Sequence, residues 1–212
     1  MDSLAMKPEE IEAESFRIID SEAGEHGWPP AEWQIVRRAI HTSADFEYAR
    51  SMVLSEGVVQ KAVAALKSGA GIVTDTNMAL SGISKARLAP FGCRVVCHVA
   101  DPDVAELAAK DGITRSIAAM RKAVANRDNR IFVIGNAPTA LFELLRLIQA
   151  GQAEPALIIG LPVGFVGAEE SKNALAAAGQ DVPFITNIGR KGGSNVAAAV
   201  VNALTILAVS QQ

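Results

Sequence analysis

The sequence predicts a single α/β domain in which a parallel five-stranded sheet carries helices on both faces. From residue 70 onward, short runs rich in β-branched residues alternate with helical patterns, as is typical of parallel sheets. These runs are almost continuously apolar, as expected for strands that are covered on both sides. The predicted strands are 70–74, 93–99, 130–134, 156–161 and 183–188.

The first third of the chain is predicted to be helical and to pack alongside this sheet. Residues 8–23 form a partly amphipathic helix, and a second helix over 31–41 follows two prolines. A third helix over 58–67 ends before Gly69. Because no run of Gly, Ser or Pro separates these helices from the strands, we expect one domain over residues 1–212.

Composition and charge exclude several classes of protein. The net charge is -3 and no basic block occurs, which argues against nucleic-acid binding. The longest apolar stretch, 196–209, has 14 residues, whereas a membrane span needs about 20, so no membrane association is expected. The N-terminal residues lack an apolar signal region, and we expect a cytoplasmic protein.

Four loops are expected to form a ligand site at one edge of the sheet. Open α/β sheets bind ligands beyond the carboxyl ends of their strands. One glycine-rich loop could be a simple tight turn, but four at the same edge favour a site. The fourth loop brings Arg190 and Lys191 and resembles an anion-binding nest for a phosphate or carboxylate. The four loops are 75–82, 135–138, 162–169 and 189–194.

Among the titratable residues, His41 is best placed for chemistry. It falls at the predicted end of the second helix, where the helix dipole favours a cation. Thr42, Ser43 and Asp45 follow and could orient the ring. Such a histidine suits proton transfer near neutral pH, although an ordinary helix-capping histidine fits the same pattern. No nucleophile motif accompanies it, so we expect acid–base chemistry without a covalent intermediate or a metal.

Two other kinds of site are disfavoured. The glycine fingerprint of a dinucleotide-binding dehydrogenase is missing, as is a phosphate-binding P-loop. Cys93 and Cys97 lie too far apart on one predicted strand to form a disulfide. With His98 beside them a metal site is conceivable, but buried thiols are the favoured interpretation.

A family resemblance rests on the segments 41–48, 135–141, 155–172 and 189–194. Together they resemble the precorrin-8X methylmutases, also called cobalt-precorrin-8 methylmutases, of corrin biosynthesis. The similarity extends over nearly the whole chain. It implies an isomerase that moves a methyl group from C-11 to C-12 of a tetrapyrrole, giving hydrogenobyrinate or its cobalt form. It also implies that no cofactor is used and that a homodimer forms, with the active site near its interface.

The resemblance assigns roles to individual residues. His41 matches the catalytic histidine and would protonate a ring nitrogen and later take the proton back. Arg38, three residues earlier, would share a helix face with it. Arginine side chains suit the acetate and propionate arms of the substrate. Substrate contacts are expected from Ser15, Arg38, Arg115, Asn136 and Arg190.

Two questions stay open at the level of sequence. A corrinoid-binding or channelling protein without catalysis would need the same anion-holding loops, and hand-over to other corrin-pathway enzymes is conceivable for either. Whether the natural substrate contains cobalt is also open, although segments 42–46 and 74–78 look more like the cobalt-pathway members of the family.

Overall fold

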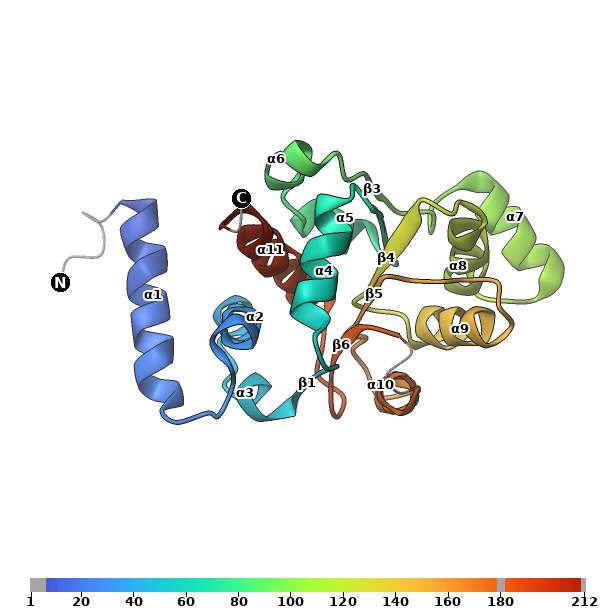
Figure 1. Cartoon of the computed structure of the whole chain (residues 1–212). Helices are drawn as coiled ribbons and strands as arrows, with labels where there is room; N and C mark the ends of the chain where they lie inside the picture. The colour runs from blue at the N-terminus through green and yellow to red at the C-terminus, as the bar shows by residue number, and fades with distance from the viewer. Residues whose placement is uncertain (1–6, 179–181, 211–212) are drawn as a thin grey trace.

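A mostly parallel sheet forms the centre of the molecule in the computed structural model, which describes residues 7–178 and 182–210 (Figure 1). Within these residues it has six strands in the order β1-β6-β5-β4-β2-β3. β2 to β6 run parallel to one another, whereas β1 pairs with β6 in the antiparallel sense. The strands are β1 (Met52–Leu54), β2 (Gly71–Thr74), β3 (Val95–Val96), β4 (Asn129–Ile134), β5 (Leu157–Gly160) and β6 (Phe184–Asn187).

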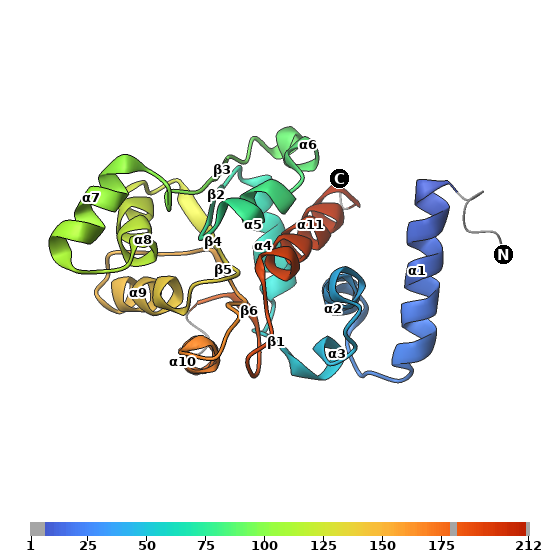
Figure 2. The ribbon, with the colours of Figure 1, turned by 180° about the vertical axis from the view of Figure 1, so that it is seen from behind.

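Helices cover both faces of this sheet, as predicted (Figure 1 and Figure 2). Side chains alternate along each strand, so Val133 lies in the core cluster that includes residues of α2, α4 and α11, while Phe132 lies in the cluster that includes residues of α8, α9 and α10. The helices are α1 (Pro8–Ala23), α2 (Pro30–Ser43), α3 (Tyr48–Ser51), α4 (Val58–Lys67), α5 (Asn77–Gly82), α6 (Lys85–Leu88), the 3₁₀ helix η2 (Ala89–Phe91), α7 (Pro102–Asp111), α8 (Arg115–Ala125), α9 (Pro138–Gln149), α10 (Ala168–Ala177) and α11 (Ser194–Ser210).

The N-terminal helices pack alongside the sheet, as predicted. α2 contacts α11 extensively, and α1 lies against α2 on the side away from the strands (Figure 1). No helix among the described residues is long and apolar enough to cross a bilayer. Residues 1–6, which contribute to the expectation that the chain has no targeting signal, lie outside the described residues.

Two details of the sheet differ from the prediction. β1 is a sixth strand that was not predicted, because three apolar residues after a helical turn carry no recognisable period, and pairing with β6 defines them. The strand predicted over 93–99 is reduced to Val95–Val96. The chain turns away at His98, whose ring nitrogen and backbone carbonyl both bond Asp101.

The strand order has its switch point between β2 and β4. β2 is followed along the chain by β3 on one side of it, and β4 then returns to the other side. The loops that leave β2 and β4 therefore meet at this point of the carboxyl edge, which is where open α/β sheets bind ligands.

Candidate active site

A buried carboxylate joins the loops that follow β2 and β4. The Asp75 oxygens accept hydrogen bonds from the backbone N–H groups of Gly135 at 2.9 Å, Asn136 at 2.9 Å and Ala137 at 2.7 Å. Burial raises the pKa of the Asp75 carboxyl, and the three N–H donors oppose that rise. These three hydrogen bonds, which we call the Asp75 clasp, fix the start of α9 and leave the Asn136 side chain at the surface.

The loops after β2, β4, β5 and β6 touch one another, which confirms that they share one edge of the sheet. Thr76 Oγ1 and Ser194 Oγ are 2.7 Å apart. A Cβ atom on Gly135 would lie 2.6 Å from Ser194 Cα, and one on Gly192 would lie 2.3 Å from the Leu161 carbonyl oxygen. Only glycine permits these backbone approaches.

The loop between β6 and α11 also reaches the segment that follows His41. Lys191 Nζ forms ion pairs with Asp45 and, at 2.7 Å, with Glu47. The sequence suggested that Lys191 adds charge for an anionic ligand, but two carboxylates already neutralise it. Arg190 in the same loop is exposed, and its guanidinium lies 5.6 Å from the centre of the Phe165 ring.

His41 lies in the last turn of α2, in a cluster formed with α1. Its ring centre is 5.0 Å from that of Phe16, and the Arg38 guanidinium lies 4.6 Å from the same Phe16 ring centre. Arg38 also bonds Glu12 of α1, and this guanidinium lowers the pKa of the Glu12 carboxyl. Ser15 precedes Phe16 and donates to the backbone of its own helix. The structure therefore brings Arg38 and His41 to one Phe16 ring, whereas Ser15 is placed only on the helix that carries this ring.

Two of the three side chains expected to orient the His41 ring, Ser43 and Asp45, are engaged elsewhere. Ser43 Oγ donates to the carbonyl of Ala39 at 2.7 Å, and Asp45 pairs with Lys191. Phe16 contacts the imidazole instead. The orientation of His41 thus depends on the packing of α1 against α2, which the local sequence after His41 does not reveal.

Arg115 and Asn136 lie apart from the His41 cluster. Arg115 is the exposed first residue of α8, and the neighbouring Thr114 Oγ1 lies 3.2 Å from Thr139 Oγ1 in α9. α8 and α9 cover the opposite face of the sheet from α2. One chain therefore does not gather all the predicted site residues into one contact group.

Sequence reasoning missed a buried lysine beneath these loops. Lys172 of α10 is 1% exposed, and its Nζ donates to Asn187 Oδ1 at 3.2 Å and to the Lys191 carbonyl oxygen at 2.6 Å. Burial lowers the pKa of Lys172 to about 8. The signal available in the sequence was a lone cation at the end of the segment 155–172.

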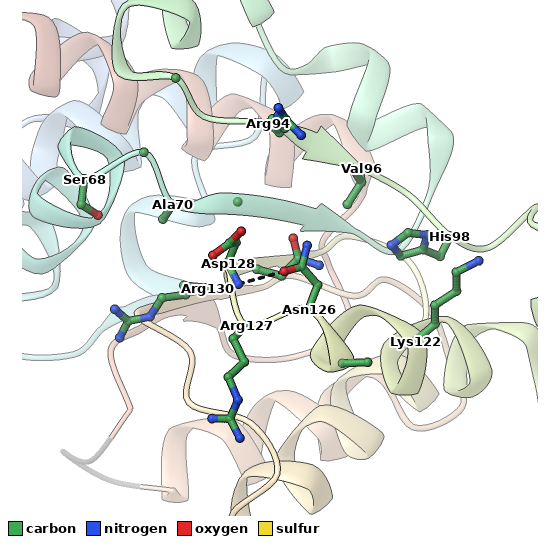
Figure 3. Close-up of a pocket in the computed structure, with 15 residues that line it drawn as sticks. Ser68, Ala70, Arg94, Val96, His98, Lys122, Asn126, Arg127, Asp128 and Arg130 are labelled. Carbon is green, nitrogen blue, oxygen red and sulfur yellow. Dashed lines mark hydrogen bonds between the residues drawn. The ribbon is translucent and has the colours of Figure 1, made fainter.

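A cleft of about 890 Å³ lies at the opposite, amino end of the sheet, beside the starts of β2 and β4. Arg94, Arg127 and Arg130 line it, and Figure 3 shows their guanidinium groups pointing in different directions. A ligand needs polar groups that converge, so we place the candidate active site at the carboxyl edge and not in this larger hollow.

Cysteine and metal chemistry find no support in residues 7–178 and 182–210. Cys93 and Cys97 are free thiols, and burial raises the pKa of both. No group of three or more His, Cys, Asp or Glu side chains in these ranges is arranged to hold a metal ion.

Fold and site together define a doubly wound α/β protein whose candidate site lies at the carboxyl edge of its sheet. A family model described as precorrin-8X methylmutase matches residues 10–207. The chain belongs to the precorrin-8X methylmutase family. The predicted class of enzyme, an isomerase of cobalamin biosynthesis, is thereby confirmed.

Individual relatives agree with this assignment. The chain is 49% identical to the cobalt-precorrin-8 methylmutase of Priestia megaterium over 98% of its own length and 91% of the relative's. It is 44% identical to the precorrin-8X methylmutase of a Sinorhizobium species, with 90% of each chain covered. A solved precorrin-8X methylmutase from Thermus thermophilus superposes with a TM-score of 0.88 at 44% identity, covering 96% of this chain and 97% of that one.

Proposed function

We propose that the chain moves a methyl group from C-11 to C-12 of a precorrin-8 macrocycle, with His41 as the proton donor and acceptor. The observation that carries the proposal is the position of His41 and Arg38 at one Phe16 ring, which puts a proton donor beside a carboxylate anchor. Protonation of a ring nitrogen by His41 draws electron density from the conjugated system and favours the 1,5-shift. The imidazole then recovers the proton, so no atom is gained or lost.

The charged arms of the substrate would be held by the remaining site residues. Arg38 and Arg190 offer guanidinium groups on the α2 side of the site, and Arg115 offers one on the α8 side. Asn136 presents its amide from the loop that Asp75 clasps, and Ser15 presents a hydroxyl from α1. Bidentate guanidinium–carboxylate pairs would fix the macrocycle in one orientation.

A homodimer would complete this site. Arg115 begins α8, on the opposite face of the sheet from α2, so a second copy is a natural source for a guanidinium that one chain does not bring to His41. The loops at the carboxyl edge also expose Phe165, which is 85% exposed, and Val166, which is 90% exposed. Exposed apolar side chains of this kind mark interfaces or ligand contacts. Sedimentation at twice the monomer mass is the expected result, and a monomer at micromolar concentration would contradict it.

The form of the substrate and the cellular setting are part of the same proposal. The names of several relatives, which are cobalt-precorrin-8 methylmutases at 43–49% identity, favour the cobalt-containing substrate. We place the reaction in the cytoplasm, with residues 1–212 acting as one domain and the product passing to a later corrin-pathway enzyme.

The direct test is a visible spectrum of the purified protein incubated with precorrin-8X and, separately, with cobalt-precorrin-8. We expect the product chromophore to develop, and faster with the cobalt form. His41→Ala should abolish the change, whereas Arg127→Ala, which precedes β4 at the amino end of the sheet, should leave it intact. Turnover by His41→Ala at the wild-type rate would overturn the role of His41, and failure with both substrates would overturn the proposed activity.

A further inference from the structure

We propose that Lys172 is a positioning residue that shapes the β6–α11 loop and holds it against the segment after His41. The inference rests on the proposed function, in which this loop contributes Arg190 to substrate binding. The ammonium group touches only the protein, since Lys172 is 1% exposed. Its effect on the reaction must therefore pass through the groups that it bonds.

The first step is the pair of contacts that Lys172 makes. Its Nζ bonds the side chain of Asn187, at the end of β6, and the carbonyl oxygen of Lys191. The Asn187 amide also donates to the Lys191 carbonyl oxygen at 2.9 Å. Two donors thus converge on one carbonyl and turn it inward, which sets the direction of the loop between Asn187 and Ser194.

The second step is the link from this loop to His41. With its carbonyl held inside, Lys191 extends its side chain to Asp45 and Glu47, which follow His41 in the chain. Asp45 in turn accepts the backbone N–H of Glu47 and caps that turn. One residue, Lys191, therefore ties a buried lysine on α10 to the segment that leaves the catalytic helix.

The third step is the cost of keeping a cation in this place. A buried ammonium must lose its hydration, and an apolar side chain of similar length would avoid that loss. None of the ion pairs among the described residues involves Lys172, whose partners are two neutral oxygens. Retention of the charge is explained by what it orients and not by a gain in packing.

The test compares Lys172→Met with Leu175→Ala in the full-length protein. Lys172→Met keeps the apolar stem and removes the donor. Leu175→Ala empties a fully buried site on the same face of α10, where the leucine packs towards Gly160 and Leu141 instead of the loop. This control variant shows how loss of packing on α10 alone affects hydrogen exchange and kinetics. Amide hydrogen exchange of peptides covering 188–193 and 43–47 is measured for both, together with kcat and KM.

For Lys172→Met we expect exchange in both peptides to rise at least about tenfold. We also expect kcat/KM to fall by about tenfold to a hundredfold, mostly through KM, as for a lost charged hydrogen bond. Leu175→Ala should lower Tm but leave both peptides and KM within about twofold of wild type. Loop exchange and KM like those of wild type, or of Leu175→Ala, would overturn the inference.

Two further arms keep the outcome decisive. If Lys172→Met does not fold, Lys172→Gln, which retains a shorter donor, takes its place in the same comparison. If wild-type protein converts neither substrate form, the proposed function fails, and hydrogen exchange alone still decides whether Lys172 positions the loop.

Discussion

The two ends of the sheet hold their charged groups in opposite ways. At the carboxyl end, Asp75 and Lys172 are buried, and each bonds the backbone of a neighbouring loop. At the amino end, Arg127 and Arg130 are exposed and point apart over a wide cleft (Figure 3). The end with the wide cleft is thus the less organised one. The comparison shows that a functional site is indicated by loops whose backbone is held by buried side chains and by donors with a fixed orientation. The volume of a cleft alone does not indicate one.

The largest difference between the two ends is expected in kcat, when the proposed proton donor is removed. His41→Ala is expected to lower kcat at least about a hundredfold, because general acid–base groups contribute factors of that size. Arg130→Ala, at the amino-end cleft, should leave kcat and KM within about twofold of wild type. Steady-state kinetics on both variants checks this. A similar loss in Arg130→Ala would show that the cleft takes part in the reaction and would break the contrast between the ends.

The next largest difference between the two ends is expected in the stability of their Asp→Asn variants. Asp75→Asn replaces one acceptor oxygen by an NH₂ group that faces backbone donors, so the free energy of unfolding should fall by about 3 kcal/mol. Asp128→Asn, in the amino-end cleft, alters an exposed side chain and should change it by less than about 0.5 kcal/mol. Urea unfolding of both variants measures the difference. Equal changes would mean that the Asp75 clasp contributes no special stability.

The architecture was predictable because its signals are local. Each of the five parallel strands is a short apolar run with a turn after it, and 8–23 and 58–67 match α1 and α4 residue for residue. β1 escaped prediction because its three residues acquire their structure from pairing with β6, about 130 residues away in the chain. The pairing of Arg38 and His41 was accessible since three residues on a helix share a face.

The organisation of the site was hidden because its bonds are long-range. Asp75 binds loop residues 60 to 62 positions away, and nothing in its own neighbourhood announces those partners. Lys191 was counted as a cation available to a ligand, yet its partner Asp45 lies 146 positions away. Residue type and spacing could place these groups at one edge of the sheet but could not show which charges are already matched.

Lys172, the buried lysine at the carboxyl end, should make the free energy of unfolding depend on pH. Burial lowers the pKa of Lys172 to about 8 in the folded chain, whereas an exposed lysine titrates near about 10.4 in the unfolded chain. Between these pH values the unfolded chain binds more protons, so the free energy of unfolding of wild type should rise with pH relative to Lys172→Met. We expect a relative gain of roughly 3 kcal/mol from pH 7 to 10.5, measured by urea unfolding. A constant difference between the two proteins would contradict it.

The smallest effect is expected from substitution of Glu12. This carboxylate pairs with Arg38, which we also propose as a contact of the substrate. The Arg38 guanidinium lowers the pKa of Glu12, so this pair stabilises the fold above pH about 4.5 and the gain is lost as the carboxyl protonates below that. Because the Glu12 side chain is 45% exposed, Glu12→Gln should cost at most about 0.5 kcal/mol at pH 7.

The kinetic consequence of Glu12→Gln decides what the ion pair does at the carboxyl end. If Glu12 competes with a substrate carboxylate for Arg38, its neutralisation should lower KM by about threefold, equivalent to roughly 0.7 kcal/mol. Glu14→Gln, which removes an exposed pair with Arg17 on the same helix, is the matched control and should leave KM unchanged. A higher KM in Glu12→Gln would mean instead that Glu12 aims the guanidinium at the substrate. Arg38 would then belong with the oriented groups of this end of the sheet, and the contrast with the exposed arginines of the amino end would become sharper.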